Sequence, residues 1–128
     1  MNDDETQALL IEHMGRGFLE NIIALFRKEP ELMRFIPAMI ADEQVAVRLG
    51  TTALVEELAT PEHRNELRAA VPGLIGLLGN ENPTVRGDAA NLLGLIGDPA
   101  AAASLRRLLE DPNAAVREIA GDALRDIG

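Results

Sequence analysis

Apolar positions along the chain follow the period of an α-helix. Near the C-terminus they form one stripe with the spacing i, i+4, i+8 and i+11, made up of Val116, Ala120, Leu124 and Ile127. On a helix of 3.6 residues per turn, this spacing places all four side chains on one face. A shorter apolar cluster precedes the stripe, and the two are separated by a helix-breaking turn, Asp111-Pro112-Asn113. The pattern predicts a pair of helices.

The same helix pair occurs three times. Six positions keep their residue class and spacing from copy to copy; they are Ile36, Met39, Ile40, Asp42, Val47 and Arg48, then Leu74, Leu77, Leu78, Asn80, Val85 and Arg86, then Leu105, Leu108, Leu109, Asp111, Val116 and Arg117. A helical repeat of about 30 to 40 residues is typical of an α-solenoid. We therefore expect an all-α superhelix of antiparallel helix pairs. Its repeats should span approximately 30–59, 60–97 and 98–128 in one continuous domain.

Short polar residues, prolines and glycines mark the ends of the predicted helices. Asp98-Pro99 and Asn82-Pro83 each combine a capping side chain with a proline suited to the first helical turn. Gly97 follows the second helix of the middle copy and is expected to end it. The helix boundaries are thus predicted by side-chain chemistry as well as by periodicity.

Two segments depart from the repeat. Residues 1–29 do not share its register, although amphipathic helical patterns occur at 8–14 and at 18–26. Terminal repeats are commonly atypical because they cover the end of the stack, so we interpret residues 1–29 as an N-terminal helical cap. The first repeat also carries additional residues at 59–68, which predict an added helical turn or two before Pro72.

The composition excludes several kinds of site. The chain has no cysteine, which excludes disulfides and thiolate ligands. It has three Phe, neither Trp nor Tyr, and a net charge of −9. Without basic patches or stacking aromatic rings, nucleic-acid binding lacks its main driving forces. No segment approaches the roughly 20 apolar residues of a membrane span, and the acidic start differs from a signal peptide. We therefore expect a soluble cytoplasmic protein with no nucleic-acid or membrane partner.

The repeated unit resembles the HEAT-repeat family, and in particular the short bacterial HEAT-like repeats of the phycocyanobilin-lyase type. The segment NPTVRGDAANLLGLIGDPAAAASLRRLLEDPNAAVREIAGDALRDIG carries this resemblance most clearly. The resemblance implies a ladder of hydrogen bonds between turn residues and second-helix arginines of successive repeats, here Asp42, Arg48, Asn80, Arg86, Asp111 and Arg117. Asn80 departs from the family pattern because it lacks a charge, so its rung should be weaker. Bilin attachment is not implied.

No constellation of residues predicts catalysis. His13 and His63 fall in different elements, and neither has a nucleophile or a ligand at a suggestive spacing. Glu62 and Glu66 lie one helical turn apart, which is typical of an ordinary solvated helix face. We therefore expect that the chain is not an enzyme, with no catalytic residue, no metal site and no cofactor.

The exposed face of the second helices is the candidate binding surface. In HEAT proteins these helices line the concave side, and the positions opposite the core, together with one flanking residue, are Leu49, Ala53, Glu56, Gly87, Asn91, Gly94, Leu95, Glu118, Asp122 and Arg125. The small residues of the middle copy predict a shallow trough. A mid-helix glycine costs about 1 kcal/mol relative to alanine. Gly87 therefore indicates either a neutral change or a close approach of another group to the backbone.

A shallow trough of mixed chemistry fits a partner helix or an extended peptide, and it lacks the enclosed pocket of a small-molecule enzyme. We therefore expect a non-catalytic protein-binding scaffold or adaptor. Two alternatives stay open. One is an accessory subunit of an enzyme system, lyase-like or otherwise; the other is a nucleic-acid-binding HEAT-like module, which the acidic charge disfavours.

The two ends of the stack are expected to differ. The predicted cap covers the N-terminal end, whereas no polar helix pair follows the last repeat in this sequence. Small residues from Ala100 to Ala103 and the nearby Ile119 would then lack a neighbour. We expect weak self-association, or a partner docked end-on, through residues 100–128. The alternative is that the charged side chains of this end make it polar enough to stay free.

Overall fold

The computed structural model describes residues 1–128, which form helices and connecting turns with no strand. The predicted all-α fold is therefore confirmed. The chain divides into two compact units, Met1–Ala69 and Ala70–Gly128, and each is described by itself. The predicted repeat boundaries and the single continuous domain stay predictions. No helix combines the length and the apolar character needed to cross a membrane.

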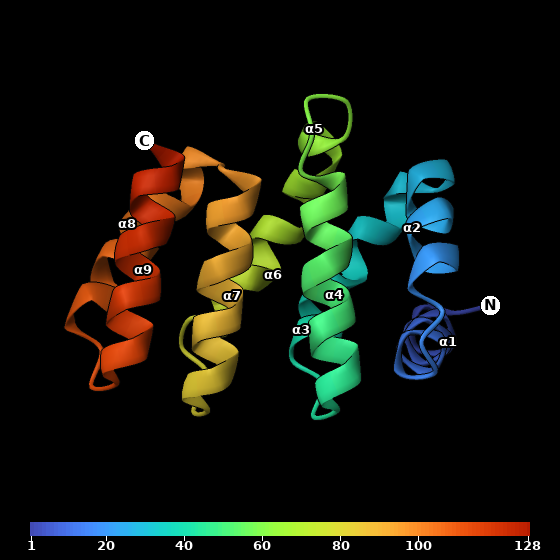
Figure 1. The fold of residues 1–128 in the computed structure, drawn as a ribbon, viewed down its shortest axis with the longest axis horizontal. Helices are drawn as coiled ribbons and strands as arrows, with labels where there is room; N and C mark the ends of the chain where they lie inside the picture. Colours follow the sequence, from blue (N-terminus) through green and yellow to red (C-terminus); the bar gives the residue numbers. More distant parts are fainter. The chain divides into compact units, whose positions relative to one another are not determined.

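The first unit holds residues 1–29, for which a cap is predicted, and the first helix pair. Its elements are α1 (Asp3–Gly15), α2 (Leu19–Lys28), the 3₁₀ helix η1 (Pro30–Phe35), α3 (Ile36–Ile40), α4 (Val45–Leu58) and α5 (Arg64–Leu67). Figure 1 shows α3 behind α4, with α1 beside α4 and viewed along its own axis. α5 lies within residues 59–68, so the added helical turn predicted there is confirmed.

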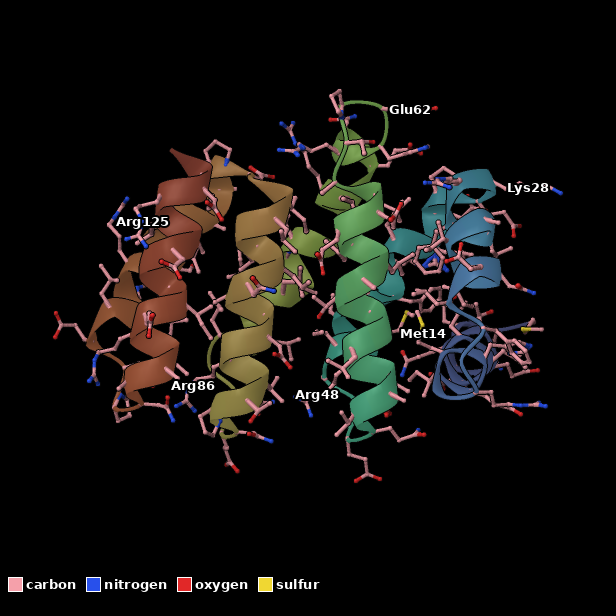
Figure 2. The ribbon with its side chains drawn as sticks, in the orientation of Figure 1. Met14, Lys28, Arg48, Glu62, Arg86 and Arg125 are labelled. Carbon is pink, nitrogen blue, oxygen red and sulfur yellow. The ribbon has the colours of Figure 1, made fainter.

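Large apolar side chains fill the interior of the first unit. Those with no exposed surface include Phe26, Met33, Ile36, Met39, Ile40, Leu54, Leu58 and Leu67. Met14 of α1 packs onto Gly50 of α4, where an added Cβ atom would lie 2.7 Å from the Met14 Cγ. Real Cβ atoms essentially never come so close, so the Met14 side chain occupies this position against α4 because Gly50 has no side chain. Figure 2 shows Met14 between α1 and α4.

The second unit holds two further helix pairs. Its elements are η2 (Arg68–Ala70, which begins in the first unit), α6 (Val71–Leu77), α7 (Pro83–Ile96), η3 (Pro99–Ala101), α8 (Ala102–Arg107), η4 (Leu108–Glu110) and α9 (Ala114–Ile127). α7 and α9 lie side by side, with α6 and α8 behind them (Figure 1). This is the arrangement expected of stacked helix pairs.

The predicted helix ends are confirmed in the second unit. Asn82 Oδ1 accepts a hydrogen bond from the backbone N–H of Thr84 at 2.9 Å, and Pro83 begins α7. Asp98 Oδ1 accepts from Ala100 N–H at 3.0 Å at the start of η3. Gly97 ends α7 with a φ of 76°, a left-handed conformation that glycine adopts without the penalty of a side chain.

The apolar stripe predicted on α9 needs correction. Val116 and Ala120 are buried as expected, but Leu124 and Ile127 are partly exposed. In the neighbouring η4, Leu109 is 41% exposed. Only α7, α8 and η4 pack substantially against α9, so the side of α9 that carries its C-terminal apolar residues is only partly covered. The contact with α7 instead buries the small residue Ala123.

Candidate functional site

Arg86 of α7 and Asp111 of the turn before α9 form a bidentate ion pair. Arg86 Nε donates to Asp111 Oδ2 at 2.8 Å, and Arg86 Nη2 donates to Asp111 Oδ1 at 2.9 Å. Arg86 Nη1 also donates to the carbonyls of Asn80 and Glu81. The side chain of Arg86 is 13% exposed and that of Asp111 is 5% exposed, and Figure 2 shows Arg86 near the lower ends of α7 and α9. One guanidinium therefore ties the turn before α7 to the turn before α9.

The charge of Asp111 is stabilised by its surroundings. The hydrogen bonds from Arg86 lower the pKa of Asp111 below its ordinary value of 3.8, although burial acts in the opposite direction. The backbone N–H of Asn113 and the positive charge of Arg117 also lower this pKa. Asp111 therefore keeps its charge, and its pairing with Arg86, at a pH where ordinary carboxyl groups become protonated.

The other residues of the implied ladder also lie at the turns or on the second helices. Arg117 Nη1 donates to the backbone carbonyl of Asp111 at 2.7 Å. Asn80 and Asp42 each accept a hydrogen bond from the backbone N–H two residues further on, at 2.8 and 2.9 Å. Arg48 occupies the corresponding position of α4 and is half-buried. Rungs other than the Arg86–Asp111 pair stay predictions.

One face of α4 exposes large apolar side chains. Leu49 is 67% exposed and Val45, four residues earlier, is 59% exposed. Ala53 is half-buried and Glu56 is exposed on the same face, because these positions follow Leu49 at helical spacing. Val45 was not among the predicted positions, although it lies at i−4 from Leu49, a helical spacing that places it on the same face. The α4 face, which we define as Val45, Leu49, Ala53 and Glu56, is thus apolar at one end and acidic at the other.

The small-residue trough predicted on α7 is corrected. Gly87 and Gly94 are buried, because they face α9 and not open solvent. A Cβ atom on Gly94 would lie 2.8 Å from the Cα of Ala123, and one on Gly87 would lie 3.2 Å from the Cδ1 of Ile119. Gly94 therefore allows close packing of α7 against α9. Of the positions predicted on α7, Asn91 is exposed and Leu95 is half-buried.

The positions predicted on α9 are exposed and charged. Glu118, Asp122 and Arg125 all face solvent, and Arg125 forms an ion pair with Asp122 one turn earlier. Figure 2 shows Arg125 on the side of α9 away from α7. This surface is therefore polar.

Self-association through the C-terminal end was predicted partly because Ile119 was expected to lack a neighbour, and this expectation is wrong. Ile119 faces Gly87 of α7, and Ala101 is fully buried. Arg106, Arg107 and Glu118 are exposed. The corrected placement favours the reading in which charged side chains cover this end. Self-association through residues 100–128 stays a prediction.

The histidines show no arrangement typical of catalysis. His63 Nδ1 lies 2.9 Å from Glu66 Oε1, and His63 Nε2 lies 3.8 Å from Glu62 Oε1. His13 Nδ1 lies 2.8 Å from the carbonyl of Leu9 within α1. No group of three or more His, Asp or Glu side chains is placed to hold a metal ion. These contacts are local and occur within single turns of the chain.

Two comparisons with known proteins bear on this geometry. The family model described as HEAT repeats matches residues 32–125. The deoxyhypusine hydroxylase of Gallus gallus is 45% identical over 78 residues, which cover 59% of this chain and 26% of that protein. The deoxyhypusine hydroxylase of Mus musculus is 50% identical over 52 residues, 39% of this chain and 17% of that protein. The chain thus spans about a quarter or less of the curated relatives it matches.

These findings correct one expectation and confirm another. The expectation that the chain is not an enzyme is contradicted, because both relatives are named as a hydroxylase. The phycocyanobilin-lyase subtype stays a prediction. The repeated helix pairs and the match over most of the chain agree, so the fold is an α-solenoid and the chain belongs to the HEAT-repeat family.

Proposed function

We propose that this helical-repeat scaffold binds another polypeptide through the exposed faces of its second helices, with the α4 face as the main contact. The observation that carries the proposal is the 67% exposure of Leu49 in the middle of a helix. Together with Val45, it forms an exposed apolar pair at i, i+4 spacing. Burying such a pair against a partner is favourable by roughly 25 cal/mol per Å² of apolar surface removed from water.

The second unit offers a polar contact surface of its own, for which we propose a role in selectivity. Asn91, Glu118 and Asp122 present acceptors, while Arg125 is held in an ion pair with Asp122. Exposed charges of this kind steer a partner and discriminate between partners more than they add affinity. The proposed partner is therefore a helix or an extended peptide with apolar and basic side chains. A cytoplasmic location is part of this proposal.

The proposal is tested by capture from the native host with matched variants. Leu49→Asp places a charge on the α4 face, while Leu109→Asp places the same charge on another exposed leucine outside that face. We expect Leu49→Asp to reduce recovery of a specific polypeptide by about tenfold or more, and Leu109→Asp to leave it unchanged. Equal recovery with both variants would contradict a contact on α4.

The relatives favour a second candidate function. Both are named for hydroxylation of deoxyhypusine, so a protein containing this chain would contribute to that reaction. Incubating the purified chain with a deoxyhypusine-containing peptide tests this directly. The assay contains dioxygen and a chemical reductant, because inserting one oxygen atom of dioxygen into a C–H bond consumes two electrons and two protons and releases the other oxygen atom as water. Mass spectrometry should then detect the gain of one oxygen atom in the peptide. An unchanged peptide after incubation would contradict activity of this chain by itself.

A further inference from the structure

A hollow lies on the first helices of the second unit, apart from the surfaces considered above. It has a volume of about 310 Å³ and lies between α6 and the α8–η4 segment. Its apolar lining comes from Ile75, Leu78 and Leu108, of which Leu78 and Leu108 are each only 7% exposed. A ligand side chain placed there would meet a preformed apolar surface, and the fold would not need to open.

Two glycines keep this hollow open. Gly76 lies within α6 and Gly79 lies just after it, and both line the hollow. Neither has a positive φ. A Cβ atom on Gly76 would meet nothing within 4 Å, and one on Gly79 would meet only the Gly76 carbonyl, at 3.8 Å. The fold therefore accepts a side chain at both positions, in contrast to Gly94. Glycine is less favourable than alanine in a helix, and its effect here is to leave room beside α6.

The charge at the rim of the hollow indicates which kind of ligand is complementary to it. Arg107 is the only charged residue that lines the hollow, and it is exposed, with Ser104 one turn away on the same helix. Its positive charge is local, because the chain as a whole carries a net charge of −9. A cationic rim beside an apolar floor is complementary to an apolar group that carries a carboxylate next to it.

We propose that this hollow is a docking site for a polypeptide segment in which a leucine-like side chain stands next to an acidic residue. The apolar side chain occupies the space beside Gly76, against Leu78 and Leu108. The neighbouring carboxylate pairs with Arg107. This site is separate from the α4 face and takes a partner of opposite charge preference, so it does not rest on the function proposed above.

Fluorescence anisotropy with short labelled peptides tests the site. The probe is Gly-Glu-Leu-Glu-Leu-Gly, compared with one peptide that has lysine in place of glutamate and another that has alanine in place of leucine. Gly76→Leu fills the hollow and Arg107→Glu reverses the charge of its rim. Ala103→Leu and Arg106→Glu are the matched controls, because both positions are exposed and neither lines the hollow.

We expect saturable binding of the glutamate–leucine peptide, and weaker binding of the other two. Gly76→Leu and Arg107→Glu should each lower its affinity about tenfold or more, while the controls retain it. Amide NMR shifts of Gly76 and Gly79 on peptide addition should report the contact in the unmodified chain. Equal binding of the lysine peptide, an equal loss with Arg106→Glu, or unshifted glycine amides would overturn the proposal. Binding of decanoate at these amides without peptide binding would also overturn it, in favour of a small amphiphile.

Discussion

Gly94 of α7 lies directly against the backbone of Ala123 in α9. An added Cβ atom on Gly94 would stand 2.8 Å from the Cα of Ala123 and 2.9 Å from its Cβ. Neither of these atoms can rotate away, since one belongs to the backbone and the other is attached to it. The distance between the two helices is therefore set by the absence of a side chain at Gly94.

Gly94→Ala should destabilise the chain even though alanine favours helix formation. Relieving the contact requires α7 and α9 to move apart, and overpacking of this kind costs about 1–3 kcal/mol. Gly76→Ala is the matched control, because its Cβ atom meets nothing within 4 Å. That variant should gain up to about 1 kcal/mol from helix propensity. Urea denaturation measures both changes, and a similar gain in the two variants would refute the close contact.

Arg86→Ala should destabilise more than Arg106→Ala. Arg86 makes two hydrogen bonds to Asp111 from a side chain that is only 13% exposed, whereas Arg106 is exposed. Losing a partly buried charged hydrogen bond costs on the order of 1–3 kcal/mol, against about 0.5 kcal/mol or less at a surface position. Equal urea midpoints for the two variants would show that the pair does not contribute.

The same pair predicts how stability depends on pH. The pKa of Asp111 is lowered in the folded chain, first of all by the hydrogen bonds from Arg86. At low pH the unfolded chain therefore binds a proton more readily at this residue than the folded chain does. The contribution of Asp111 is fully present above its ordinary pKa of 3.8 and is lost as the pH falls below that value.

Asp111→Asn tests this pH dependence, because the amide does not ionise. The difference in unfolding free energy between the original chain and the variant should be constant at neutral pH and should shrink as the pH falls below about 4. Urea titrations at a series of pH values measure it. A difference that stays the same down to the lowest pH would contradict the lowered pKa.

Asn91→Arg tests whether α7 takes part in partner binding. Asn91 is exposed, so the melting temperature should change little. Recovery of the partner should fall, since the new positive charge would oppose the basic side chains that we propose for the partner. Full recovery with an unchanged melting temperature would remove α7 from the proposed contact surface.

The sequence predicted the helices well because their ends carry local signals. Asn82, Asp98 and Gly97 act within one or two residues of the positions they mark. The crossing of α1 and α4 could not be found in this way. It depends on Met14 meeting Gly50, two residues far apart in the sequence, of which Met14 lies outside the repeats.

The candidate surface was predicted less accurately. The position of a residue around a helix tells which face it lies on, but it does not tell which other helix packs against that face. Gly87 and Gly94 lie on the side of α7 opposite the core, yet that side packs against α9. Their helical positions relative to the core predict that both glycines face solvent, whereas the packing of α9 against α7 buries them. Leu49 occupies the position in α4 that corresponds to Gly87 in α7, and it is 67% exposed. Periodicity alone does not separate these two cases.

The most direct test of the central claim places a photo-crosslinking amino acid at position 49 of the full chain in the native host. Because Leu49 is exposed on α4, the group would stand within reach of a bound partner without disturbing the core. The same group at position 109 is the control. The account predicts a discrete adduct with one polypeptide from position 49 and none of that polypeptide from position 109. The same adducts from both positions, or none from position 49, would contradict partner binding through the α4 face.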